Sequence, residues 1–269
     1  MHPLQSNQRR SILPLALLVL SWSGTSGCAL EQRMAVEVID APLRETGQEL
    51  QASRSPSDEL RLGSYTITSI QRQHTRDGTP LLPDLKPRPS TFYHLSFELQ
   101  RSDAQHATTS FWVNCVAERR VAQNSDFAAA ADESHDEVAL TCTLHNKNTN
   151  TWTLSAQGDV NRGLSGSVGH VGGAKSEHPA EEPPLSTPSR SAFEVEVLAR
   201  RRFFGAVARE LPFPVAQLRR EHHASAAMLL DTPERAWLAK GLSHDDRELA
   251  LATMVALRLL PLGEGPIGR

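Results

Sequence analysis

The segment Gly169–Ser176, with the sequence GHVGGAKS, contains the residue types from which proteins build phosphate-binding loops. Such a loop needs converging backbone N–H groups and the N-terminus of a helix directly after it. Here Ala174 stands in the place of the second glycine, and Pro179 and Pro183 exclude a helix after the loop. We therefore predict no nucleotide site and no other cofactor.

Three other groups contain reactive side chains without the surroundings that would activate them. Ser165, in Gly163–Ser167 (GLSGS), lacks the strand-to-helix turn of a nucleophilic serine. The acidic stretch Asp132–Glu137 (DESHDE) lacks the glycine of a calcium loop and the spacing of a zinc site. His222 and His223 are adjacent and point to different faces of any regular element. The sequence predicts no catalytic residue and no metal site.

The segment Ala199–Gly205 (ARRRFFG) mixes arginine with phenylalanine, as nucleic-acid and membrane interfaces do. The chain as a whole has a formal net charge of −3, which offers no basic field for nucleic acid. A strand end with Phe203 buried and the arginines in solvent explains the segment equally well. We predict no nucleic-acid partner.

The N-terminus has the pattern of an export signal. Arg9 and Arg10 precede the apolar run Ile12–Leu20, and small residues fill positions 23–27. The apolar run would form a helix of roughly 14 Å, too short for a hydrocarbon core of about 30 Å. A basic start, a short apolar run and small residues together predict a cleaved signal peptide.

The end of this signal, Thr25-Ser26-Gly27-Cys28, resembles the lipobox of bacterial lipoproteins. The resemblance implies that Cys28 is lipidated and becomes the new N-terminus. By the same analogy, Ala29 in place of Asp permits sorting to an outer membrane. The alternative is ordinary cleavage, for example after Ala29, which would give a soluble periplasmic or secreted protein.

The two remaining cysteines, Cys115 and Cys142, form an even pair in an exported chain and predict a disulfide. Phe111, Val113 and Cys115 stand at every second position, and Cys142 follows Leu140 at the same two-residue period. If both segments are strands, each cysteine lies on the apolar face. Two buried free thiols are the alternative.

Composition divides the chain into five segments. Residues 1–27 form the signal peptide, and residues 28–58 lack apolar periodicity and predict a flexible tether. A β-rich lobe covers residues 59–157. Residues 158–191 are rich in Gly, Ser and Pro and predict a linker or a long loop. Residues 192–265 contain strands and a helix that belong to the same body.

Alternating apolar residues predict most of the strands. Leu60–Ile70 alternates with a slip after Ile67, and Thr91–Gln100 alternates throughout. The segments 224–231 and 235–241 are separated by a short turn and predict a hairpin.

The C-terminal region contains the clearest helix of the chain. Ser243 has the position of an N-cap, with Asp246 three residues later, and Pro261 ends the pattern. Leu249–Leu260 is apolar nearly all round, as in a helix buried on most sides. We expect an α+β, mainly β fold: an antiparallel sandwich or barrel packed with one buried C-terminal helix.

This outline is similar to the tubby- and scramblase-like barrels, which enclose such a helix, but no motif carries the analogy. Three functions follow as hypotheses. The first is a non-enzymatic, lipid-anchored envelope protein that binds an envelope protein or ligand. The second is an exported hydrolase with a site from distant strands, for instance His94 and a carboxylate. The third is a lipid carrier, which requires that the C-terminal helix lie outside the barrel.

Overall fold

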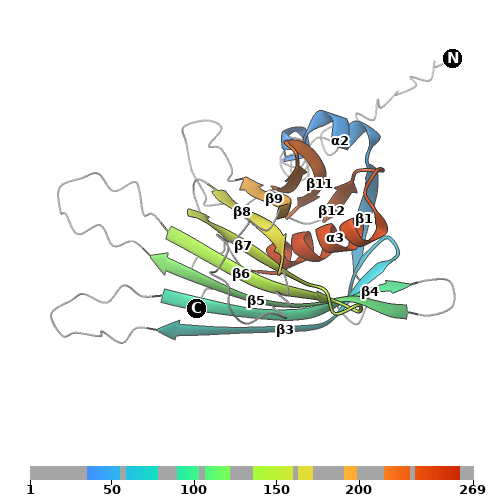
Figure 1. Ribbon diagram of the computed structural model, residues 1–269. Helices are drawn as coiled ribbons and strands as arrows, with labels where there is room; N and C mark the ends of the chain where they lie inside the picture. Colours follow the sequence, from blue (N-terminus) through green and yellow to red (C-terminus); the bar gives the residue numbers. More distant parts are fainter. Residues whose placement is uncertain are drawn as a thin grey trace, which may run out of the picture.

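The computed structural model describes residues 35–54, 59–77, 90–102, 107–121, 136–159, 163–171, 191–198, 215–230 and 234–260. These residues form a closed barrel of twelve antiparallel strands with a helix inside it (Figure 1). The strands are β1 (Gln48–Arg54), β2 (Leu60–Leu62), β3 (Tyr65–Asp77), β4 (Ser90–Ser102), β5 (Ala107–Val121), β6 (Asp136–Asn146), β7 (Thr151–Asp159), β8 (Gly163–His170), β9 (Ser191–Leu198), β10 (Val215–Arg220), β11 (His223–Leu229) and β12 (Arg235–Leu238). The helices are α2 (Ala41–Thr46) and α3 (His244–Leu259).

The strand order follows the chain. Each strand pairs with the strands before and after it in sequence, and β12 pairs with β1 to close the ring. The predicted hairpin of the C-terminal region is confirmed, because β11 pairs with β12. Of the two predicted arrangements, sandwich or barrel, the chain adopts the barrel.

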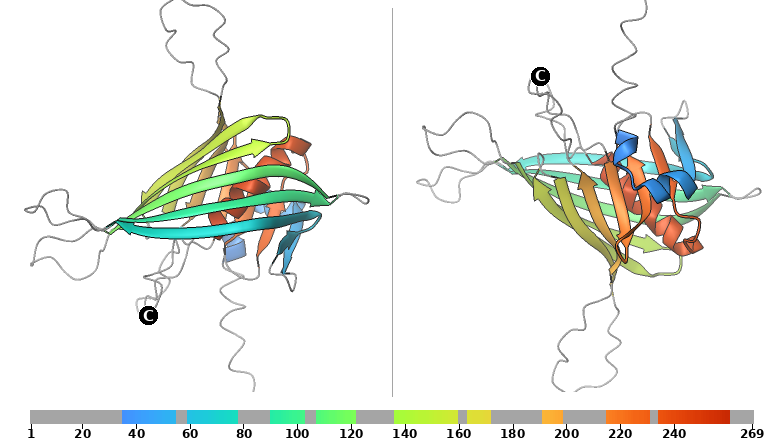
Figure 2. Two further views of the ribbon diagram at one scale, coloured as in Figure 1. Left: turned by 90° about the horizontal axis from the view of Figure 1, so that it is seen from below. Right: turned by 90° about the horizontal axis from the view of Figure 1, so that it is seen from above.

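Helix α3 occupies the interior of the barrel (Figure 2). Every residue from Glu248 to Leu257 is buried, which requires protein on all sides of the helix. The helix contacts β4, β5 and β6 on one side and β10 and β11 on the other. The predicted buried helix is therefore confirmed, and Ser243 caps it by accepting a hydrogen bond from the backbone N–H of Asp246. Within the described residues, no helix combines the length and the apolarity needed to cross a membrane.

Alternation along the strands fills the space around α3. In β4, Leu95, Phe97 and Leu99 are buried while the residues between them are more exposed. The slip in the first strand pattern corresponds to a bulge in β3 between Thr68 and Gln71, where Ser69 has φ 54°.

The N-terminal region departs from the predicted tether. Residues 35–38 and α2 are helical and lie on the outside of the barrel, where Ile39 and Leu43 pack against Trp237. The tether assignment for 28–58 is wrong for α2 and β1, and its first residues lie outside the described part. An outward-facing apolar patch on β10–β12 provides the packing energy that local periodicity did not indicate.

The predicted linker 158–191 also contains a strand. β8 pairs with β7 and β9 along its length, so the linker assignment is wrong for these residues. A Cβ at Gly158 or Gly166 would collide with the neighbouring backbone. Glycine here permits close approach of two strands, whereas composition alone indicated chain flexibility.

The strands divide the barrel into two regions of different length. β9–β12, β1 and β2 are short and surround α3 together with one half of β3–β8 (Figure 2). The other half of β3–β6 projects past the C-terminal end of α3 (Figure 1). β2 pairs with β3 only from Tyr65 to Ile67, so closure is confined to the region around the helix.

Candidate functional site

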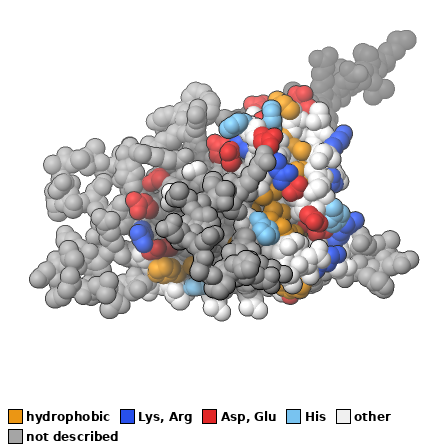
Figure 3. All heavy atoms as spheres, in the orientation of Figure 1, with side chains coloured by type: hydrophobic (Ala, Val, Ile, Leu, Met, Phe, Trp, Pro, Cys, Tyr) orange, Lys and Arg blue, Asp and Glu red, His pale blue; other side chains and the backbone are white. Residues whose placement is uncertain are grey.

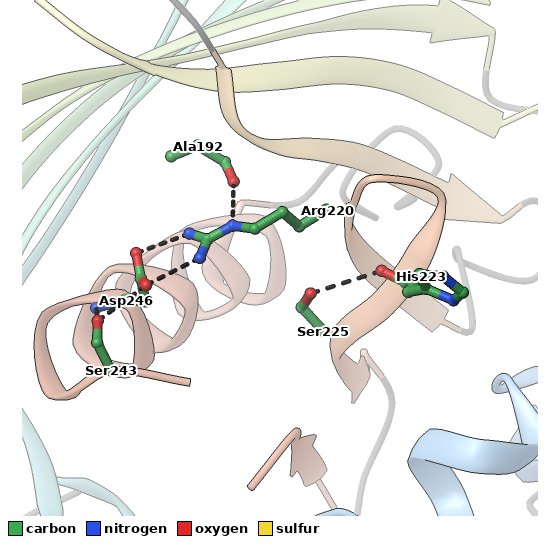
Figure 4. A network of polar contacts seen from close by, with 6 residues as sticks. All are labelled: Ala192, Arg220, His223, Ser225, Ser243 and Asp246. Carbon is green, nitrogen blue, oxygen red and sulfur yellow. Dashed lines mark hydrogen bonds and ion pairs between the residues drawn. The ribbon is translucent and has the colours of Figure 1, made fainter. Parts of the chain in front are cut away.

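The N-terminal end of α3 contains a polar network that joins it to the barrel wall (Figure 4). Arg220, at the end of β10, donates two hydrogen bonds to the Asp246 carboxylate, at 2.9 and 2.7 Å. The Ser243 hydroxyl donates to the same carboxylate at 2.8 Å. The hydrogen bonds from Arg220 hold the pKa of Asp246 below its ordinary value, so the carboxylate stays charged.

Arg220 also contacts the neighbouring strand. Its Nε donates to the carbonyl of Ala192 at 3.0 Å, and its guanidinium lies 4.6 Å from the centre of the Phe193 ring. The hydrogen bonds that Arg220 donates to Asp246 raise the pKa of Arg220 above its ordinary value. Each of the three guanidinium nitrogens thus donates to β9 or to α3, which indicates a positioning role.

The opposite end of α3 has a second ion-pair network. Glu234, which is 3% exposed, accepts hydrogen bonds from Arg54 at 2.9 Å and from Arg258 at 3.0 Å. Burial by itself raises the pKa of Glu234. Hydrogen bonds from its own backbone N–H and from Arg54, with the charges of both arginines, outweigh burial and lower it. This network connects β1, the start of β12 and the last turn of α3.

A third carboxyl, Glu248, lies in a different environment near the start of α3. It is 7% exposed, and the Nδ1 atom of His244 lies 3.3 Å from its Oε1. Burial raises its pKa, against the opposing effects of His244, a hydrogen bond from Ser110 of β5, and the charges of Arg101 and Lys147. A carboxyl of this kind can take up a proton more readily than an exposed glutamate.

The carboxyl–imidazole pair has no further partner for metal chemistry. His244 is half exposed, and the described residues contain no group of three His, Cys, Asp or Glu side chains placed to hold a metal ion. The pair can store a proton at the barrel mouth. The Ser110 hydroxyl beside it is engaged in a hydrogen bond with the Glu248 carboxyl.

The predicted disulfide is present. Cys115 and Cys142 lie directly opposite each other on β5 and β6, with sulfur atoms 2.06 Å apart. Both side chains face the barrel interior, 3% and 0% exposed. The alternation rule placed both on the apolar face, and that prediction is confirmed.

The structure does not bring the other candidate residues together. Ser165 is exposed on β8, His94 is exposed on the outer side of β4, and His222 and His223 are exposed beside a tight turn. Cys28, the stretch 132–135 of the acidic segment, and the Arg–Phe segment 199–205 lie outside the described residues.

Neither arginine network follows from the sequence. Arg220 and Asp246 are separated by 26 positions, and Arg54 and Glu234 by 180. Neither separation forms a local pattern, since the pairs exist only once the barrel closes around α3. The one available signal was a carboxylate in the first turn of an otherwise apolar helix.

Comparison of the chain with protein-family models, with curated proteins and with solved structures finds no match.

Proposed function

We propose that the chain is a non-enzymatic binding protein of the bacterial envelope, anchored to a membrane through lipidated Cys28 and presenting the outer surface of its barrel to an envelope partner. The observation that supports binding at the outer surface is that the interior of the barrel is already occupied. The chain's own helix fills the barrel, with Leu251 and Val255 fully buried at its centre. The surface then remains as the place for recognition.

The occupied interior argues against carriage of lipid in the barrel. A carrier requires α3 outside, whereas its buried residues contact strands on both sides. The two ion-pair networks hold the helix at both ends, which opposes its exchange for a ligand. Displacing α3 would leave Glu234 without Arg258 and Asp246 without Arg220.

The described part of the outer surface carries charges of both signs. Cross-strand pairs join Arg219 to Glu196 and Arg235 to Glu49, at 3.2 and 2.8 Å. On the face shown in Figure 3, acidic and basic side chains of the described residues intermingle. Such a surface suits recognition of a protein partner more than of nucleic acid.

The anchor would hold the barrel close to the membrane. Ile39 and Leu43 attach the N-terminal segment to the outside of β10–β12. The chain between Cys28 and Ala35 can span at most about 25 Å. The side of the barrel that contains α2 would therefore lie nearest the membrane, with the projecting half of the strands free to meet a partner.

Mass spectrometry of the membrane fraction tests the anchor. Cells expressing the full-length gene are expected to yield a mature chain that begins at Cys28 and has the mass of a diacylglyceryl and an acyl group. The matched variant Cys28→Ala should lose this mass and leave the membrane fraction. An unmodified chain that begins at or beyond Ala29 would refute the anchor and leave a soluble exported protein.

A further inference from the structure

The projecting half of β3 forms an edge of the sheet. β4 pairs with β3 along its whole length, whereas β2 pairs with it only as far as Ile67. Among the described residues, no strand pairs with β3 beyond that point on the side away from β4. Residues 71–76 are all exposed. Every second residue of such an edge directs its N–H and C=O away from the sheet, where another strand can bind them.

The bulge in β3 determines which side chains line this edge. Opposite residues of an antiparallel pair share a face, and Arg72 lies opposite Leu95, which is buried on the inner face. His74 and Arg76 follow Arg72 at the same two-residue period. Without the bulge at Ser69, neutral residues would take these positions.

On the described strand β4, the residues opposite the basic side chains of the edge are uncharged. Opposite them on β4 stand Thr91, Tyr93 and Leu95, which carry no negative charge. Arg72 and Arg76 form no ion pair with another described residue. On the same face of β5, the described residues of the projecting half add Arg119 and no acid. The edge therefore combines open backbone groups with a stripe of one sign.

We infer that this edge binds an extended segment of a partner protein as an added β-strand in which alternate residues are Asp or Glu. Main-chain hydrogen bonds to β3 supply the affinity, and the acidic side chains pair with Arg72 and Arg76. The inference names the partner class of the binding function proposed above and rests on that function. It does not depend on the lipid anchor.

A second copy of the chain is the less suitable occupant. In an antiparallel β3–β3 pairing around His74, Arg72 of one copy would face Arg76 of the other on the same side. Like charges directly opposite each other destabilise a strand pair. Charge complementarity thus selects an acidic strand and disfavours self-association through this edge.

Hydrogen–deuterium exchange on the full mature protein tests the inference. The probe is a synthetic peptide that alternates Glu with Thr and Val (TEVEVET), and fluorescence anisotropy of its labelled form gives the affinity. We expect slower exchange of amides within 68–77 when the probe is present. A peptide with Gln in place of Glu should bind about tenfold more weakly, and one with Pro between the Glu residues should give no protection.

A charge-reversed variant and its control separate this edge from general charge effects. Arg72→Glu/Arg76→Glu should weaken the probe by about tenfold or more, whereas Arg61→Glu/Lys240→Glu, with the same change in net charge, should leave the affinity within about twofold. Unchanged binding to the first variant would overturn the inference. So would protection, in the free protein, of the alternate amides of 68–77 that point away from β4, or a dimer formed through this edge.

The two experiments distinguish failure of peptide binding at the β3 edge from failure of the lipid anchor. Exchange reports on residues 68–77 whether the protein comes from the membrane or from the soluble fraction, and the mass of the N-terminal peptide reports on Cys28. An edge that serves only to repel other strands would show no protection by the probe, which would overturn the inference and leave the anchor unaffected.

Discussion

The half of the barrel around α3 and the half that projects beyond it differ in what fills them. Around α3, inward side chains such as Leu99 and Leu218 are fully buried against an apolar helix. Beyond α3, the inner face of β3 ends in exposed Arg72 and Arg76. A barrel of about eight strands can fill itself with side chains, whereas twelve strands leave space for a helix about 10 Å wide. The helix therefore determines where this sheet can close.

The largest effect should come from removing volume at the centre of the filled half. Leu251→Ala should lower the free energy of unfolding by about 4 kcal/mol, because Leu251 is fully buried and leaves a cavity. Urea unfolding followed by tryptophan fluorescence gives this value. The control Val116→Ala, on the outer side of β5, should change it by less than about 0.5 kcal/mol. Equal losses would contradict the role of the helix as the filler.

The second prediction concerns the Cys115–Cys142 disulfide, which joins two strands that run through both halves of the barrel. Replacing both Cys115 and Cys142 with Ala should lower stability by about 3 kcal/mol, since the bond closes a loop with a sequence separation of 27. Denaturation with and without reductant measures the effect. Reductant should destabilise the wild-type protein and have no effect on the variant. A wild-type protein insensitive to reductant under unfolding conditions would contradict the contribution of this bond.

The Arg220–Asp246 pair tests how firmly the helix is held at its N-terminal end. Asp246→Asn should lower stability by about 1.5 kcal/mol at neutral pH. The pKa of Asp246 is lowered in the folded state, so its contribution is present above the ordinary aspartate value of 3.8 and is lost as pH falls through the folded value. The stability difference from wild type should therefore shrink on acidification.

Asp245 provides the matched control for this measurement, because it is adjacent and 71% exposed. Asp245→Asn should have a much smaller effect at neutral pH, because the charge of Asp245 interacts with the first turn of the helix and with His244 but does not join α3 to β10. An equal loss in the two variants would mean that general charge at the helix terminus, and not the pair with Arg220, stabilises this end.

Substitution of Glu248 should give the smallest change in stability, and at neutral pH this change should be an increase. Its raised pKa means that ionisation costs the folded state, so the contribution to stability is greatest below the ordinary value of 4.5 and is lost as pH rises through the folded value. Glu248→Gln should therefore raise the melting temperature slightly at pH 7 and have less effect at pH 4. The exposed control Glu45→Gln should leave the melting temperature at pH 7 nearly unchanged. A destabilised variant at pH 7 would show that His244, Arg101 and Lys147 outweigh burial.

The sequence predicted those features that local patterns carry. Alternation identified β4 and the inward cysteines, the capping residue located the start of α3, and the slip after Ile67 marked the bulge. It failed where packing overrides composition: α2 is held by an apolar patch on distant strands, and β8 uses glycine for close approach. The arginine networks and the open edge of β3 depend on closure of the barrel. No short stretch of the sequence contains the information for that closure.

The order in which the chain leaves the ribosome has a consequence for its folding. The strand that closes the ring, β12, and the helix that fills it, α3, are the last of the described elements to emerge, while their partner β1 emerges among the first. Until then the growing sheet has an empty centre and two open edges, one at each end of the meander. Closure must wait for the C-terminal region, so the unclosed sheet is exposed to wrong strand pairing until β12 and α3 have been synthesised.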